Sequence, residues 1–294
     1  MAIETVAVTG GNGKIGEAIL AHLNEHGYET ANLARGKRRE EVSDSYYTTD
    51  LLEAGEVYGS LARSGADAII HMGTIPGPTS HPGYVTYESN VMSSYHVLEA
   101  ATELGLESAC LASSVNAMGA IYQDDPIEVE YFPIDEDHPL TPRDPYAMGK
   151  HALEVTADGF GRQNRAPHTV STLRYPWVAT GEELRAAYAE SERTLDAVDV
   201  EAGGARNDLY LYLHIEDAAD VARRCVEADY EGHETFWAVA ADSNMETPTA
   251  EIIDEVYPDD VDVRADFEDH EALVTCEKAR DLLGWEPERT WRDL

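Results

Sequence analysis

A glycine-rich segment near the start of the chain restricts the fold more than any other sequence feature. Gly10, Gly13 and Gly16 directly follow an apolar run over residues 3–8 and open a helical pattern over residues 14–25. Glycines permit a tight turn and let a pyrophosphate approach backbone N–H groups at a helix N-terminus. A flexible turn would also be rich in glycine, but its position between a first strand and a first helix favours a dinucleotide site.

Apolar runs and helical patterns alternate along most of the 294-residue chain. Further short apolar runs predict strands over residues 30–34, 66–72, 108–114 and 169–175. Apolar positions three and four residues apart predict further helices over residues 84–104 and 146–162. Strands that alternate with helices in this way predict a parallel sheet with helices on both faces.

The pattern predicts an α/β fold, a Rossmann-type doubly wound parallel sheet with a smaller C-terminal substrate-binding lobe. Residues 1–175 are expected to form the dinucleotide-binding domain and to carry the catalytic residues. The alternation becomes irregular after Pro176. Residues 176–294 are therefore expected to form mainly the substrate lobe, with some segments returning to the core.

The charge of the chain excludes several classes of partner. Against 57 acidic residues stand 21 cationic ones, so the formal net charge is −36. Such a surface repels nucleic acid and anionic membranes, and neither is expected as a partner. The acids are dispersed through segments with regular apolar positions and only four cations are lysine, a composition similar to that of halophilic proteins.

Other features of composition predict a cytoplasmic protein. No apolar run approaches the roughly 20 residues that span a bilayer, and the N-terminus has no signal-peptide pattern. Cys110, Cys225 and Cys276 are odd in number and far apart in sequence. That spacing favours reduced thiols over a disulfide framework or a zinc site.

A cluster of cations follows the second predicted strand. A site for NAD would place an acid there to bind the ribose 2′-hydroxyl, but the strand ends with Arg35, Lys37, Arg38 and Arg39 nearby. Arg35, with Lys37 or Arg38, could bind a 2′-phosphate, although the same cations could pair with the nearby glutamates. We therefore expect NADP to be the preferred cofactor, with NAD possible.

Tyr146 and Lys150 stand four residues apart at the start of a predicted helix, and therefore on one face. A nearby lysine is expected to hold the pKa of the phenol down, which would make Tyr146 an acid and base near neutral pH. The pair could also be two ordinary helix residues. Its place behind a dinucleotide loop favours catalysis.

With these motifs the chain resembles the extended short-chain dehydrogenase/reductase family, also described as NAD-dependent epimerases and dehydratases. The resemblance covers nearly the whole chain. Its motifs are the glycine loop, Tyr146 with Lys150, and the stretches at residues 50–51, 71–73, 90–101, 113–119, 173–176, 213–219 and 278–287.

The resemblance implies a role for each matching position. Ser114, Tyr146 and Lys150 would be catalytic: Ser114 would bond to the reacting oxygen, Tyr146 would move its proton, and Lys150 would bind the nicotinamide ribose. The cofactor-binding residues would be Gly10, Gly13, Lys14, Ile15, Gly16, Arg35, Asp50, Leu51, Met72, Gly73, Asn90, Lys150, Tyr175 and Val178. The substrate-binding residues would be Thr74, Ser114, Asn116, Tyr146 and Arg174, with no metal.

Some of these roles have plain structural alternatives. Asp50 and Asn90 could be ordinary capping residues. Arg174 could bind a substrate carboxylate, which would favour a uronate, or it could be a strand-end arginine in a structural ion pair. The sequence leaves these alternatives open.

Departures from the family pattern restrict the reaction. Members that dehydrate nucleotide sugars need an Asp-Glu pair after the active-site hydroxyl, but here Val115 and Asn116 follow Ser114. The chain looks closer to members that oxidise free sugars, namely uronate dehydrogenases and haloarchaeal dehydrogenases that act on L-arabinose. We therefore expect an NAD(P)-dependent sugar dehydrogenase that oxidises a free aldose at C1 to the lactone, acting as a homo-oligomer (dimer or tetramer).

Two rival functions remain. One is an epimerase acting on sugars or nucleotide sugars, which keeps its NAD(P) bound and returns the hydride. The other is a non-enzymatic NADP sensor, which would not need the acid–base residues Tyr146 and Lys150.

Overall fold

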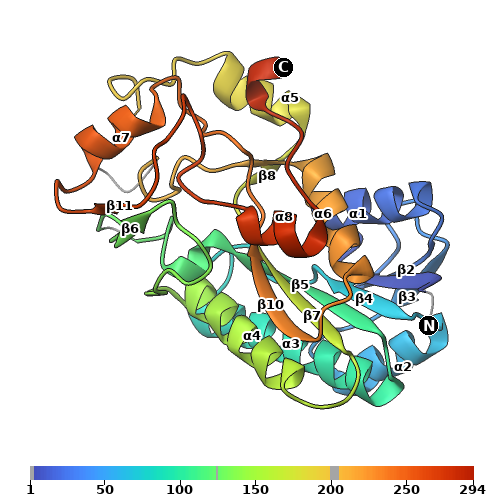
Figure 1. Cartoon of the computed structure of the whole chain (residues 1–294). Coiled ribbons are helices and arrows are strands. Elements are labelled where there is room, and N and C mark those ends of the chain that lie inside the picture. The colour runs from blue at the N-terminus through green and yellow to red at the C-terminus, as the bar shows by residue number, and fades with distance from the viewer. Residues whose placement is uncertain (1–2, 124, 199–204) are drawn as a thin grey trace.

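A seven-stranded parallel sheet forms the centre of the protein (Figure 1). The computed structural model describes residues 3–123, 125–198 and 205–294. The strands are β1 (Thr5–Thr9), β2 (Glu29–Ala34), β3 (Ser45–Thr48), β4 (Ala68–His71), β5 (Ser108–Ser114), β7 (Thr169–Tyr175) and β10 (Gly232–Trp237). Their spatial order is β10-β7-β5-β4-β1-β2-β3. This order confirms the predicted Rossmann-type fold.

Helices cover both faces of the sheet, as predicted (Figure 1). On one face α1 (Lys14–Glu25) packs against α6 (Ile215–Glu227), with α8 (Glu277–Leu283) beside α6. On the other face α3 (Gly83–Leu104) lies between α2 (Ala54–Ser64) and α4 (Pro145–Gly161). The catalytic candidates of α4 are thus held against β5 and β7.

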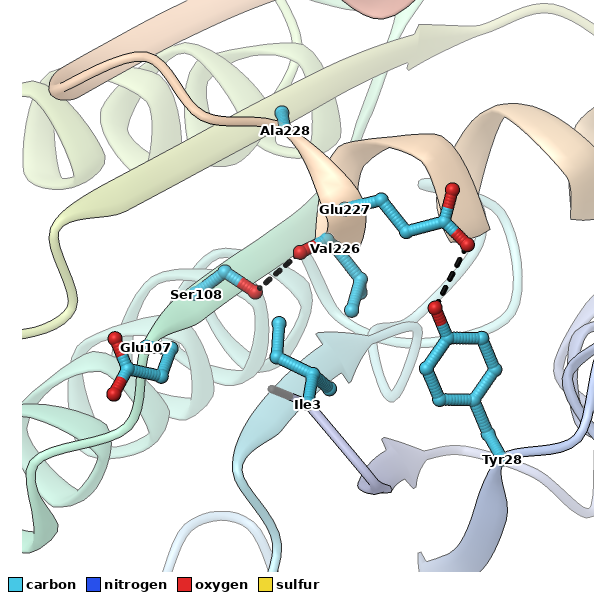
Figure 2. A pocket seen from close by; sticks show the side chains of 7 residues that line it. All are labelled: Ile3, Tyr28, Glu107, Ser108, Val226, Glu227 and Ala228. Carbon is cyan, nitrogen blue, oxygen red and sulfur yellow. Dashed lines mark hydrogen bonds between the residues drawn. The ribbon is translucent and has the colours of Figure 1, made fainter. Parts of the chain in front are cut away.

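The two ends of the parallel strands differ. At the amino end, a cavity of about 310 Å³ is lined by residues such as Ile3 and Tyr28, and its hydroxyl groups are paired: Tyr28 donates to Glu227 and Ser108 to the carbonyl of Val226 (Figure 2). The carboxyl end carries the loops that follow β1, β4, β5 and β7. Ligands of open α/β sheets bind at the carboxyl end, so the functional site is sought there.

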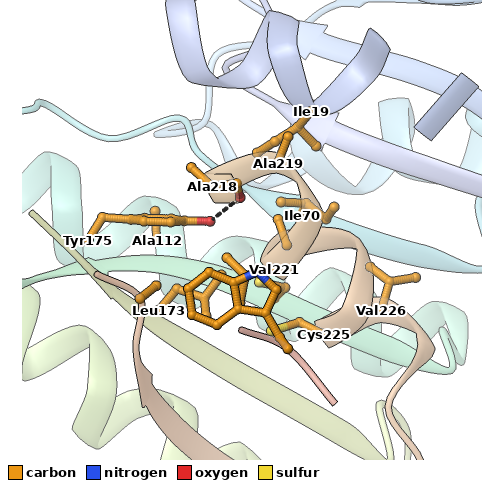
Figure 3. Close-up of a cluster of buried hydrophobic side chains, with 14 of the residues drawn as sticks. Ile19, Ile70, Ala112, Leu173, Tyr175, Ala218, Ala219, Val221, Cys225 and Val226 are labelled. Atoms are coloured by element: carbon orange, nitrogen blue, oxygen red, sulfur yellow. Dashed lines mark hydrogen bonds between the residues drawn. The ribbon is translucent and has the colours of Figure 1, made fainter. Parts of the chain in front are cut away.

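Alternation along β1 explains how one strand serves two cores. Val6 and Val8 pack with the cluster that includes Ile19 of α1, whereas Ala7 packs with the cluster that includes Val97 of α3. Figure 3 shows the first cluster, in which the Tyr175 hydroxyl donates to the carbonyl of Ala218 at 2.8 Å. Fully burying one such apolar side chain stabilises the fold by roughly 1.5–3 kcal/mol.

The remaining elements gather at the carboxyl end of the sheet. They are the 3₁₀ turn Val115–Met118, β6 (Tyr131–Phe132), β8 (Val178–Ala179), α5 (Gly181–Leu184), the π-helical turn Arg185–Ala189, β9 (Leu213–His214), α7 (Thr249–Val256), β11 (Asp262–Val263) and the 3₁₀ turn Trp291–Asp293. β6 pairs with β11, so a segment before residue 175 lies with the C-terminal lobe. Conversely, β10 and α6 return to the Rossmann core. The boundary at residue 175 stays a prediction.

No described helix is both long and apolar enough to cross a bilayer. Cys110 and Cys225 are buried in the core and Cys276 is partly buried, and all three are free thiols, as the sequence predicted.

Candidate active site

A cavity of about 760 Å³ lies between the glycine loop and the ends of β2 and β4. It is lined by most of the predicted cofactor residues: Gly10, Gly13, Lys14, Ile15, Gly16, Arg35, Asp50, Leu51, Met72 and Gly73, together with Thr74. Asn90, Lys150, Tyr175 and Val178 do not line it. The structure therefore brings together residues that are up to 64 positions apart in sequence.

The glycine loop fits a dinucleotide. Gly10 has a φ of +71°, and a Cβ atom there would lie 2.9 Å from the Cα of Gly73. A Cβ atom at Gly16 would lie 2.4 Å from the carbonyl oxygen of Gly10. Gly13 caps α1 without a side-chain hydrogen bond, so the N–H groups of the first turn stay available for an anion.

The basic segment after β2 has a different arrangement from the predicted one. Arg35 and Arg39 line the cavity, whereas Lys37 and Arg38 do not. Arg38 donates instead to the backbone carbonyls of Glu40 and Ser43. Asn12 accepts a hydrogen bond from the backbone N–H of Arg39 at 3.1 Å and so ties this segment to the glycine loop.

Glu40 stabilises the same segment through hydrogen bonds to its buried side chain. Its carboxylate is buried, and it accepts hydrogen bonds from Asn32, Val42 and Ser43. Burial raises the pKa of Glu40, but these hydrogen bonds outweigh burial and lower it to about 2. The carboxylate therefore stays charged and holds the turn that carries the cations.

Ser114 is the last residue of β5, and Tyr146 and Lys150 lie in the first turns of α4. Their exposed fractions are 5%, 6% and 1%. α4 begins where it does because Asp144 accepts hydrogen bonds from the N–H groups of Tyr146 and Ala147, and Pro145 occupies the first helical position. This cap fixes the direction in which Tyr146 enters the site.

The pKa of Tyr146 differs from the sequence expectation. Burial raises it to about 12, and the Ser114 hydroxyl counteracts that rise by hydrogen bonding. Lys150 does not hold it down, because its ammonium lies 5.7 Å from the centre of the Tyr146 ring and bonds elsewhere. In the protein alone, Tyr146 is therefore a neutral phenol at physiological pH.

Lys150 connects the strand ends around the site. Its ammonium donates to the carbonyl of Ala112 at 2.5 Å and to the Thr74 hydroxyl at 3.0 Å. Burial lowers the pKa of Lys150 to about 7, against the opposing effect of Glu154. Small changes around Lys150 therefore decide whether it carries a charge near neutral pH.

Asn116 supports the serine. Its backbone N–H and its side-chain amide both donate to the Ser114 hydroxyl, at 3.1 and 3.3 Å. The side-chain oxygen of Asn116 is buried and has no hydrogen-bond partner within the described part of the chain. A buried acceptor without a partner is unusual in a folded protein.

Three predicted site residues are engaged elsewhere. Both Nε and Nη2 of Arg174 donate to the Glu154 carboxylate at 3.0 Å. Arg174 therefore forms a structural ion pair, the alternative to binding a substrate carboxylate. The side-chain amide of Asn90 bonds to the backbone N–H and carbonyl of Ile75, so it holds the loop after β4. The hydroxyl of Tyr175 bonds to the carbonyl of Ala218.

Tyr122 was not singled out in the sequence. Its ring lies edge-on to the Tyr146 ring, with centroids 6.1 Å apart, and is 40% exposed. The Tyr122 hydroxyl lies close to Gly77 in the loop after β4. Nothing in the local sequence marks this residue, because its contact depends on the path of the loop after β5.

No group of three or more His, Cys, Asp or Glu side chains in the described residues could hold a metal ion. The site thus combines a glycine loop that can bind an anion, the buried side chains of Ser114, Tyr146 and Lys150, and the polar side chains of Thr74 and Asn116. This arrangement suits proton transfer at an alcohol or carbonyl carbon next to a bound dinucleotide.

Comparison with known proteins agrees with this description. The sequence model of the NAD dependent epimerase/dehydratase family matches residues 6–239, and the chain belongs to that family. A UDP-glucose 4-epimerase of Rhizobium leguminosarum bv. trifolii is 25% identical over 98% of this chain and 94% of its own length. An NAD-dependent glucose-6-phosphate dehydrogenase of Haloferax volcanii is 27% identical over 78% of this chain and 82% of its own length.

Solved structures show the same fold at low identity. A mutated uronate dehydrogenase has a TM-score of 0.69 and 18% identity, covering 99% of this chain and 84% of that one. A short-chain dehydrogenase/reductase superfamily protein from Agrobacterium tumefaciens with bound NAD has a TM-score of 0.71 and 19% identity, covering 98% of this chain and 94% of that one.

Proposed function

We propose that the chain is an NAD(P)-dependent dehydrogenase that oxidises a free aldose, such as L-arabinose, at C1 to the lactone. The observation that carries the proposal is the buried set of Ser114, Tyr146 and Lys150 near a glycine cradle with an uncapped helix N-terminus. An intact acid–base set also argues against a non-enzymatic NADP sensor, which has no use for it.

Each residue of the set has one task in the proposed oxidation. Ser114, held by Asn116, donates a hydrogen bond to the C1 oxygen. Tyr146, once its phenol has released its own proton, accepts the proton of the C1 hydroxyl as that oxygen becomes the lactone carbonyl. Two of the three N–H donors of Lys150 go to Ala112 and Thr74, which leaves one for a ribose hydroxyl. A bound nicotinamide dinucleotide supplies the hydride acceptor.

The cofactor is proposed to be NADP by preference. Arg35 and Arg39 line the cavity at the end of β2, where an acid would be needed to favour the ribose hydroxyl of NAD. Guanidinium groups bind phosphate through two parallel hydrogen bonds, so this pair suits a 2′-phosphate. Arg39 replaces Lys37 and Arg38 as the second candidate because only Arg39 reaches the cavity.

The substrate is proposed to be a neutral free sugar. Glu154 already occupies Arg174, which was the candidate for binding a uronate carboxylate. Asn116 and Thr74 offer neutral polar groups for hydroxyls. The NAD-dependent glucose-6-phosphate dehydrogenase of Haloferax volcanii is a relative whose sugar carries no nucleotide, which supports oxidation over epimerisation of a nucleotide sugar.

The second candidate is an epimerase that keeps its cofactor. The UDP-glucose 4-epimerase relatives favour it, because one of them matches 98% of this chain. An epimerase borrows a hydride and returns it, so free cofactor shows no net reduction. A dehydrogenase releases one reduced cofactor for each sugar.

Incubation with a panel of free aldoses, uronates and nucleotide sugars, with added NADP or NAD, separates the two. We expect stoichiometric cofactor reduction together with lactone or aldonate when a free neutral aldose is present. Interconversion of nucleotide sugars without net reduction would overturn the proposal. The predicted homo-oligomer is checked on the same preparation by light scattering after size-exclusion chromatography.

A further inference from the structure

A buried polar cluster lies behind the catalytic residues. Glu154 and Arg174, 5% and 3% exposed, form a two-bond ion pair, and the Ser113 hydroxyl donates to Glu154 at 2.6 Å. Every member adjoins a residue of the site. Ser113 precedes Ser114, Arg174 precedes Tyr175, and Glu154 follows Lys150 by one helical turn. The cluster thus joins β5, β7 and α4 directly beneath the chemistry.

Stability alone gives little reason for such a cluster. Removing two charges from water is costly, and apolar replacements of a buried ion pair are often neutral or stabilising. The Nη1 atom of Arg174 is also buried without a hydrogen bond in the described residues, although its guanidinium lies 5.1 Å from the ring centre of Trp237. Glu154 stands one helical turn after Lys150, on the same face of α4, and this position offers a functional reason.

We propose that Glu154 is a positioning residue for the dehydrogenase chemistry. Its carboxylate, fixed by Arg174 and Ser113, keeps the buried ammonium of Lys150 charged and aimed at the site. The role rests on the proposed function, because it acts through the ammonium of Lys150 on the binding of the nicotinamide ribose. It also reassigns Arg174 from the substrate to the support of Glu154.

Among the residues that the structure describes, Glu154 is the nearby negative charge that acts on Lys150. Tyr146 on α4 is neutral, and His71 on β4 is neutral because burial lowers its pKa to about 3. Glu154 in turn faces Arg174 of β7 and His233 of β10, and burial also lowers the pKa of His233. Beyond Arg174 lies Glu136, whose pKa burial raises and the positive charges of Lys278 and Arg174 lower. Removing the Glu154 charge is therefore expected to favour neutral Lys150.

The test follows Lys150 directly. The chain has only four lysines, so ¹³C-lysine labelling gives few NMR signals, and the signal absent from Lys150→Arg identifies Lys150. We expect Glu154→Gln to move the titration midpoint of Lys150 to lower pH, whereas Glu154→Asp, which keeps the charge, leaves it close to that of the unaltered protein. Asp217→Asn, which breaks another buried carboxylate pair with Arg289, serves as the matched control and should not move it.

Activity provides the second readout. With Glu154→Gln we expect kcat/KM at pH 7 to fall about tenfold and to recover in part at lower pH, where Lys150 regains its proton. If Glu154→Gln folds poorly because Arg174 is left alone, Glu154→Gln/Arg174→Gln removes both charges and should shift the midpoint in the same direction. An unchanged Lys150 midpoint in the folded variants, or an equal shift in Asp217→Asn, would overturn the role. The NMR measurement needs no sugar, so failure to oxidise any aldose would overturn only the proposed function.

Discussion

The two ends of the proposed cofactor site are built in opposite ways. At the catalytic end, Ser114, Tyr146 and Lys150 are nearly inaccessible to water and each has a defined hydrogen-bond or charge partner. At the other end, Arg35, Lys37, Arg38 and Arg39 are exposed cations on a turn. Interactions in a dry, prearranged site are stronger than those in water. The difference implies that the reaction is fixed by the buried end, while cofactor choice depends on weaker and more easily altered contacts.

The largest effect is expected from the buried end. Tyr146→Phe removes only the ionisable oxygen, and we expect kcat to fall by about 10²–10⁴-fold, the range for losing a general acid–base group. Cofactor affinity, measured by fluorescence titration, should stay close to that of the unaltered protein. If the variant retained most of its turnover, Tyr146 would not be the acid–base group, and the buried end would not determine the reaction.

His71 provides a pH test of the same buried end. It accepts or donates hydrogen bonds at both ring nitrogens, to Thr9 at 2.8 Å and to Ser93 at 3.2 Å. Burial, with a smaller effect of Lys150, lowers its pKa to about 3. The unfolded chain takes up a proton near pH 6.5 whereas the folded protein does not, so stability is complete above that pH and is lost as pH falls towards 3.

Between pH 7 and pH 4.5 this linkage amounts to about 3 kcal/mol. His71→Gln keeps hydrogen-bonding groups but does not titrate. We therefore expect its free energy of unfolding, from denaturant curves in molar KCl, to change less between these two pH values than that of the unaltered protein. The same change in both proteins would show that His71 is not a buried neutral group.

The sequence was sufficient for the parts of the site that depend on local spacing. The glycine loop follows from a strand, a turn and a helix in succession, and Tyr146 and Lys150 share a face because they stand one helical turn apart. The parallel sheet with helices on both faces follows from the alternation of strands and helices along the chain. These features need no knowledge of distant contacts.

Features that depend on distant partners were not predictable in this way. Arg174 looked available until β7 placed it against Glu154 on α4, 20 residues earlier. Arg39 rather than Arg38 reaches the cavity because Glu40 and Ser43 hold Arg38 through their backbone carbonyls. The pKa of Tyr146 rises because burial, which local spacing does not reveal, outweighs its neighbours.

The exposed end should show a smaller, graded effect. If Arg35 binds a 2′-phosphate, the protein should have a higher kcat/KM with NADP than with NAD, and Arg35→Ala should narrow that difference by about 1–3 kcal/mol. Lys37→Ala is the matched control, because Lys37 is an exposed cation of the same turn that does not line the cavity. A native preference for NAD would mean that the turn is only a surface feature.

Salt should act in opposite directions on the fold and on the exposed end. With a net charge of −36, repulsion between acids weakens the folded state in dilute buffer, and molar KCl screens that repulsion. We expect the melting temperature to rise by at least about 2–4 °C, equivalent to ~1 kcal/mol.

The same screening should narrow the preference for NADP, because the attraction between exposed arginines and a phosphate is weakened. The proton transfer at the buried Tyr146 should keep its pH profile. A melting temperature that is insensitive to KCl would contradict the halophilic interpretation, and an unchanged NADP preference would show that the cofactor phosphate is bound away from solvent.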